Sequence, residues 1–160
     1  MYDLPEIFLA LDQWVARENV RARAQGTLVY KRCTVRVLGQ AALFAAGVDL
    51  ALTATQDLDA YGNYEWAVQQ ELERLLAEKG KVLDPHGSEV WMPKETQYNP
   101  IFQGTFVEAL VADADAVLVS KALKAADKNR ALVTEYLAKG AAPRFFELAR
   151  KYRVDLEQFV

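Results

Sequence analysis

The apolar residues of this chain change their spacing repeatedly along the sequence, and this alternation constrains the fold more than any other feature. Residues 4–24 carry leucine, isoleucine, tryptophan and valine at helical spacing, whereas residues 34–38 alternate as a strand does. Helical spacing returns at 41–46 and 64–79, with an extended segment expected at 51–61 between them. This order of elements predicts a fold that mixes helices and strands.

Prolines and glycines divide residues 81–112 into short pieces, beyond which helical spacing continues to the end of the chain. Short strands are expected near 81–84, 88–92, 100–102 and 105–111. We therefore predict an α+β fold with α/β-like features, namely a small mixed sheet with helices followed by a C-terminal helical bundle. The 160 residues suit a single domain, with a core over about 1–112 and a helical tail over 113–160.

Composition narrows the classes of protein that this sequence can encode. Of its residues 52% are hydrophobic, enough to bury a full core, yet no apolar stretch reaches the ~20 residues needed to span a bilayer. The start of the sequence lacks the basic residues of a signal peptide, and a single cysteine favours the reducing cytoplasm. We expect a cytoplasmic protein that does not bind a membrane.

The formal net charge of −3 argues against sequence-specific binding of duplex DNA. The charge is unevenly spread, with a balance of +2 over residues 1–40, −9 over 41–120 and +4 over 121–160. An acidic middle between basic ends suits a cation site flanked by groups that hold anions. It equally suits a solvated surface without a function.

Two aspartates, Asp57 and Asp59, lie two residues apart in the segment expected to be extended. Successive side chains of a strand point to opposite faces, so both carboxylates share one face while Leu58 is buried on the other. Such a pair suits Mg²⁺ or Mn²⁺, which take oxygen ligands and leave coordination positions open for phosphates. The alternative is a pair of solvated acids at the end of an edge strand.

A possible phosphate site lies about twenty residues upstream, where the strand over 34–38 meets Gly39 and a helix begins. The free N–H groups at the start of a helix, together with the positive end of its dipole, attract anions. Gly39 allows the backbone to come close to a ligand. The sequence thus places a candidate phosphate-binding turn before a candidate metal-binding pair.

These segments resemble the polymerase-β-like nucleotidyltransferase superfamily. The similar residues are 37–43 (VLGQAAL), which match the glycine turn and helix, and 57–59 (DLD), which match its paired acids. Residues 118–130 (LVSKALKAADKNR) are similar to the lysine-bearing helix of minimal bacterial nucleotidyltransferase-like proteins. That branch includes abortive-infection proteins and the toxins of toxin–antitoxin pairs.

The resemblance implies metal-dependent transfer of a nucleotidyl group from a nucleoside triphosphate to an acceptor such as a protein or a tRNA, with an antitoxin as a further partner. The implied catalytic residues are Asp57, Asp59, Glu89 and Lys121. The implied nucleotide-binding residues are Gly39, Gln40, Thr55 and Lys128. Asp57 and Asp59 would hold Mg²⁺ or Mn²⁺, and Glu89 would be the third carboxylate on a neighbouring strand.

Three positions depart from the family pattern. Gln40 replaces a small residue of the glycine turn, Thr53 stands where the family has arginine, and Asn129 replaces an aspartate. These departures favour a second hypothesis, in which the chain is a catalytically degenerate binding or regulatory protein. A helix-rich adaptor, with an incidental acidic pair, is a third.

Overall fold

A computed structural model describes residues 3–53 and 55–160. In chain order its elements are α1 (Leu4–Gln25), β1 (Cys33–Val37), α2 (Gly39–Ala46), β2 (Asp57–Leu58), β3 (Ala60–Gly62), α3 (Trp66–Glu78), β4 (Val82–Leu83), the 3₁₀ turn η1 (Gly87–Glu89), β5 (Tyr98–Gln103), β6 (Val107–Ala112), α4 (Ala114–Lys124), α5 (Arg130–Ala138), α6 (Pro143–Lys151) and the 3₁₀ turn η2 (Leu156–Phe159). The expected α+β class, with a mixed sheet and C-terminal helices, is confirmed.

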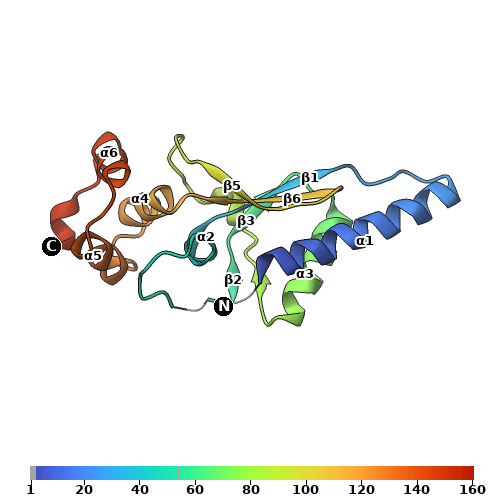
Figure 1. Cartoon of the computed structure of the whole chain (residues 1–160), viewed down its shortest axis with the longest axis horizontal. Coiled ribbons are helices and arrows are strands. Elements are labelled where there is room, and N and C mark those ends of the chain that lie inside the picture. Colours follow the sequence, from blue (N-terminus) through green and yellow to red (C-terminus); the bar gives the residue numbers. More distant parts are fainter. Residues whose placement is uncertain (1–2, 54) are drawn as a thin grey trace.

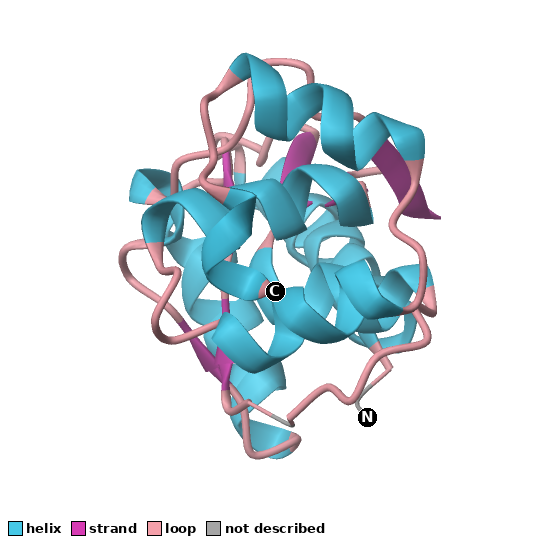
Figure 2. Ribbon diagram, turned by 90° about the vertical axis from the view of Figure 1, so that its left-hand side faces the viewer, coloured by secondary structure: helices cyan, strands magenta, loops and turns pink. Residues whose placement is uncertain are grey.

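The main sheet has four strands in the order β3-β1-β6-β5. The two central strands, β1 and β6, are parallel, and each pairs with an antiparallel outer strand. Helices α1 and α3 lie along one side of this sheet, while α4, α5 and α6 gather beyond the end where β6 leads into α4 (Figure 1). Viewed from that end, the helices around the C-terminus lie in front of the strands (Figure 2). The carboxyl ends of β1 and β6 therefore point toward the C-terminal helices.

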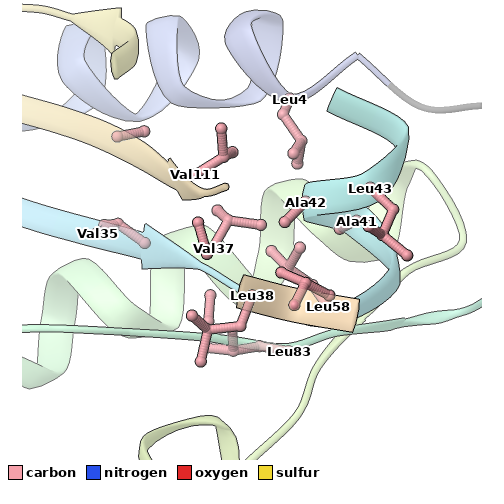
Figure 3. Close-up of a cluster of buried hydrophobic side chains, with 14 of the residues drawn as sticks. Leu4, Val35, Val37, Leu38, Ala41, Ala42, Leu43, Leu58, Leu83 and Val111 are labelled. Atoms are coloured by element: carbon pink, nitrogen blue, oxygen red, sulfur yellow. The ribbon is translucent and has the colours of Figure 1, made fainter. Parts of the chain in front are cut away.

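A second, two-stranded sheet joins β2 and β4 in parallel. Its inward residues Leu58 and Leu83 pack with Leu38, at the end of β1, and with Val35 and Val37 (Figure 3). These side chains are nearly or completely buried. Strand β2 is therefore anchored by the buried side chain of Leu58, which fixes the positions of Asp57 and Asp59 on either side of it.

Two of the expected strands differ from the structure. In the segment 51–61 only the short strands β2 and β3 form, and Ala54 lies outside the described residues. Residues 88–92 are not a strand, and Gly87 packs so closely on the backbone of Ala60 that a side chain there would overlap it. The chain turns there as η1 instead.

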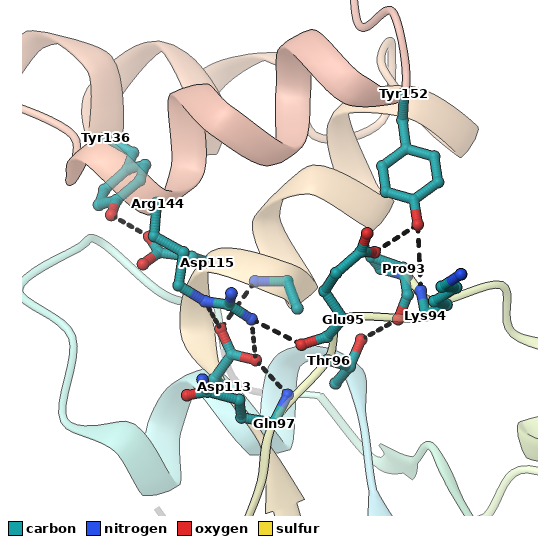
Figure 4. A network of polar contacts seen from close by, with 11 residues as sticks. Pro93, Lys94, Glu95, Thr96, Gln97, Asp113, Asp115, Tyr136, Arg144 and Tyr152 are labelled. Atoms are coloured by element: carbon teal, nitrogen blue, oxygen red, sulfur yellow. Dashed lines mark hydrogen bonds and ion pairs between the residues drawn. The ribbon is translucent and has the colours of Figure 1, made fainter.

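A polar network ties the C-terminal helices to the sheet (Figure 4). Arg144 of α6 donates to both carboxylate oxygens of Asp113, at 3.1 and 3.2 Å, and to the backbone oxygen of Glu95. Asp113 also accepts the N–H groups of Gln97 and Ala116. Burial alone would raise the pKa of Asp113, but the hydrogen bonds from Arg144 and these N–H groups lower it overall.

Changing Asp113 to asparagine is expected to lower the free energy of unfolding by about 2 kcal/mol, because Arg144 loses its charged partner. The pKa of Asp113 is depressed in the folded protein, so its contribution is present at neutral pH and is lost in acid as the carboxylate is protonated. Urea denaturation at pH 7 and pH 3 measures both effects. A mutant as stable as the wild type at pH 7 would contradict this assignment.

Within the described residues, no helix is both long enough and apolar enough to cross a bilayer.

Candidate functional site

The turn between β1 and α2 brings Gly39 against Asp59. Gly39 has a φ of +61°, in the left-handed region that favours glycine. A Cβ atom added to Gly39 would overlap Oδ2 of Asp59. The backbone N–H of Leu38 donates to the backbone oxygen of Asp59 at 2.7 Å. Glycine is therefore required at position 39 by its conformation and by the space that the carboxylate fills.

A second carboxylate, Asp84, lies beside Asp59. The parallel register pairs Asp57 with Val82 and Leu58 with Leu83, so Asp59 and Asp84 follow at matching positions. Burial raises the pKa of Asp59 to about 6, and a hydrogen bond with Asp84 and the charge of that carboxylate act in the same direction. The nearby Lys121 opposes this rise. Ionisation of Asp59 is therefore disfavoured.

Asp59 opens onto a cavity of about 470 Å³ between the sheet and the C-terminal helices. Its lining comes from the β1–α2 turn, the residue between β2 and β3, the end of η1 with the segment after it, α4 and the turn that follows α4. The lining residues are Gly39, Asp59, Glu89, Val90, Trp91, Met92, Val117, Ser120, Lys121, Lys124, Ala125, Lys128 and Asn129. The volume suits a small molecule of nucleotide size.

Three lysines give this cavity its positive charge. Burial lowers the pKa of Lys121, the charge of Lys128 lowers it further, and Asp59 partly opposes them. The Lys121 ammonium donates to the side-chain oxygen of Asn129 at 3.4 Å, and that of Lys124 lies 5.6 Å from the centre of the Trp91 ring. Among the described residues, none of the three lysines has an ion pair within 4 Å.

The structure brings together five of the eight residues singled out from the sequence. Gly39, Asp59, Glu89, Lys121 and Lys128 all line the cavity. Glu89, however, belongs to the exposed turn η1, where one of its oxygens lies 3.0 Å from Nδ1 of His86. It was expected on a strand next to the paired acids.

The other three residues, Gln40, Thr55 and Asp57, are not part of the cavity lining. The side-chain amide of Gln40 donates to the backbone oxygen of Thr53 at 3.1 Å, and the Thr55 hydroxyl accepts the backbone N–H of Asp57 at 3.2 Å. Asp57 itself is exposed. These contacts shape the loop that leads into β2.

Sequence reasoning missed Asp84, the carboxylate that lies closest in register to Asp59. A signal was present, because both acids follow a leucine that ends a short strand, in Asp57-Leu58-Asp59 and in Leu83-Asp84. The pairing of these two strands was not evident from either segment alone. The cavity residues Lys124 and Trp91 were also not assigned to a site.

The donor set can be compared with the needs of a divalent cation. Within residues 3–53 and 55–160, no three or more acidic, histidine or cysteine side chains gather into a metal cage. Mg²⁺ does not need one, since it is commonly held by one or two carboxylates, water and the phosphates of a substrate. Two carboxylates are on offer: Asp59 lines the lysine-bearing cavity, and Asp84 lies beside Asp59 without being part of the lining itself.

No protein-family model matches this chain, and no curated protein and no solved structure is significantly similar to it.

Proposed function

We propose that the cavity binds a nucleoside triphosphate together with Mg²⁺ or Mn²⁺, and that the protein transfers the nucleotidyl group to an acceptor hydroxyl. The observation that carries this proposal is that Gly39 and Asp59 line a single cavity together with three lysines, Lys121, Lys124 and Lys128. This arrangement lies at the carboxyl ends of the parallel strands β1 and β6, where ligands commonly bind in sheets of this kind.

The cavity is lined by carboxylates and by lysines, a combination that suits phosphoryl transfer. In the transfer, the bond between the α-phosphorus and the bridging oxygen to the β-phosphate breaks, a bond from the acceptor oxygen to the α-phosphorus forms, and pyrophosphate leaves. A divalent cation supplies charge neutralisation of the phosphates when bound. Asp59 and Asp84 would hold it, and the Asp59–Asp84 pair could accept the proton of the acceptor hydroxyl.

The lysines and the start of α2 would bind the phosphates that leave as pyrophosphate. Helix α2 begins at Gly39 without a side-chain cap, and Gly39 lines the cavity, so a phosphate bound there would meet the positive end of this helix. The Lys121 ammonium, held by Asn129, and that of Lys128 would neutralise the negative charge that develops on the leaving pyrophosphate. We place this chemistry in the cytoplasm, with a protein or tRNA as the acceptor.

A second candidate is a nucleotide-binding protein without turnover that acts through a partner, such as the antitoxin of a pair. The observation that favours it is the position of Asp57, which is exposed and lies outside the cavity lining. A site with fewer carboxylates around the metal can bind the metal–nucleotide complex and still fail to activate an acceptor.

Radiolabelled nucleotides separate these two functions. The protein is incubated with Mn²⁺ and each of the four nucleoside triphosphates, labelled at the α- or the γ-phosphate, together with total RNA and total protein as acceptors. Transfer of the α-label without the γ-label supports the nucleotidyltransferase, and binding of labelled nucleotide without transfer supports the second candidate. Absence of both binding and transfer would contradict the proposal.

Changing Lys121 to glutamine is expected to slow any transfer by about 100-fold, because a preorganised charge near the leaving group is lost. The matched control is Lys94→Gln, which removes an exposed lysine that does not line the cavity. Initial rates with α-labelled nucleotide measure the effect. Equal rates for the two variants would exclude Lys121 from the chemistry.

A further inference from the structure

The most unusual surface of the molecule lies far from the cavity, at the end of α1 and the chain that follows it. We call residues 17–32 the arm. Figure 1 shows this part of α1 and the returning chain extending beyond the strands and beyond α3. The arm contains the last nine residues of α1, the helix-ending Gly26 and the segment that leads back to β1.

The arm is held in a defined shape by contacts of its own. The side chain of Asn19, almost fully buried, accepts the N–H of Tyr30 at 2.7 Å and donates to the oxygen of Tyr30 at 3.1 Å. The Tyr30 ring stacks on Trp14, with 5.9 Å between ring centres. The backbone N–H of Thr27 donates to Ala22 at 2.9 Å. The returning chain is therefore fixed against the helix.

This fixed arm exposes apolar side chains among positive charges. Leu28 is 95% exposed and Val20 is 66% exposed. The arm has five cationic residues, of which three are arginines of α1, and the single carboxylate of Glu18, which gives a net charge of +4. Since the whole chain has a net charge of −3, the remainder carries −7. Apolar residues surrounded by arginine are typical of protein–protein interfaces.

Helix α3, next to α1, has the complementary character. With its N-cap residue Glu65 it contains four carboxylates and one arginine, Arg74, and it begins with Trp66, which is 74% exposed. Glu71 is buried and pairs with Arg74, as Glu78 also does, so the acidic surface consists of Glu65, Glu73 and Glu78. Glu65 is linked to the arm of its own chain, because its carboxylate accepts the N–H of Lys31 at 3.3 Å. Basic and acidic surfaces, each with an exposed apolar residue, therefore adjoin on one side of the molecule.

We infer that the arm docks on α3 of a second copy of this chain, and that the exchange is reciprocal. Each copy offers both surfaces, so a two-fold axis pairs each arm with the partner's α3 and closes the assembly as a dimer. The apolar residues of the arm distinguish this partner from nucleic acid, whose phosphates would engage the cations and leave Leu28 and Val20 exposed.

The size of the surface is consistent with a dimer. A stable interface usually takes about 20–30 residues from each partner. An arm of sixteen residues alone falls short of this number. Reciprocal docking adds the exposed face of α3 to each side, with Trp66 facing the partner's arm, and brings the total into the usual range.

Sedimentation equilibrium of the full chain tests the inference. We expect a dimer of about 36 kDa, twice the 18.0 kDa of one chain, in about 50 mM salt, and weaker association in about 500 mM salt, where charges are screened. Leu28→Asp and the double change Arg17→Glu with Arg23→Glu should each weaken association at least about tenfold, because the dissociation rate rises when interface contacts are lost. All these side chains are exposed, so the monomer should stay folded by circular dichroism.

The matched control is Lys94→Glu with Arg150→Glu, which makes the same change of charge at exposed positions outside the arm and α3. It should leave the dimer intact. A wild-type chain that stays monomeric at low salt overturns the inference, as does a dimer that the arm variants do not weaken. A monomer whose arm instead binds labelled single-stranded RNA also overturns it.

Discussion

Changing Asp59 to asparagine is expected to abolish the rise in melting temperature that Mg²⁺ with a nucleoside triphosphate produces in the wild-type protein. A ligand at 100 times its Kd stabilises a native protein by about 2.7 kcal/mol, and this linkage disappears when the site is lost. Asp59 lines the cavity, and its carboxylate occupies the space that a Cβ at Gly39 would need. Differential scanning fluorimetry with and without nucleotide measures the loss.

The same change is expected to stabilise the protein when no ligand is present. The folded-state pKa of Asp59 is raised to about 6, so the folded protein loses stability as the pH rises from about 4 through 6, and the cost is complete above that range. Asparagine has no such cost. We expect Asp59→Asn to increase the free energy of unfolding by about 1–2 kcal/mol at pH 7.5, with little difference at pH 4.

Asp57→Asn is the matched control, because it makes the same chemical change two residues away at an exposed position. It should alter stability by less than about 0.5 kcal/mol at either pH. Loss of stability in Asp59→Asn at pH 7.5, with an unchanged response to Mg²⁺ and nucleotide, would mean that Asp59 is a structural residue.

Changing Gly39 to alanine is expected to destabilise the protein by about 3 kcal/mol and to eliminate nucleotide binding. The alanine would have to adopt a φ of +61°, and its Cβ would collide with the Asp59 carboxylate. Displacing that carboxylate removes the contact on which the proposed site depends. Urea denaturation and nucleotide titration measure the two effects.

Gly47→Ala separates conformational strain from the collision. Gly47 ends α2 with a φ of +67°, close to that of Gly39, but a Cβ there would meet nothing within 4 Å. It should cost about 1 kcal/mol, the strain alone. Adding Asp59→Gly to Gly39→Ala should recover the difference between the two glycine variants. Equal costs for Gly39→Ala and Gly47→Ala would show that the carboxylate does not lie where the structure has it.

Local patterns predicted the helices and the central strands well. The helical spacing over residues 4–24 matches α1, because one face of this helix packs on the sheet and so must be apolar. The alternation at 34–38 marks β1, whose residues are buried alternately. In both, the pattern reflects burial against a neighbouring layer.

Contacts between distant segments could not be predicted in the same way. The pairing of β2 with β4 depends on two-residue strands whose alternation is too short to detect, so Asp84 was missed as the neighbour of Asp59. The turn at Gly87 depends on the backbone of Ala60, which is 27 residues away. Local propensity has no information on such contacts.

The most direct test of the proposed site is the position of a Mn²⁺ ion, located by anomalous scattering in crystals grown with Mn²⁺ and a non-hydrolysable ATP analogue. The account predicts a peak within coordination distance of Asp59 and Asp84, with the phosphates of the analogue directed toward Gly39, Lys121 and Lys128. A nucleotide bound elsewhere, or a cavity that remains empty while Mn²⁺ occupies another site, would contradict it.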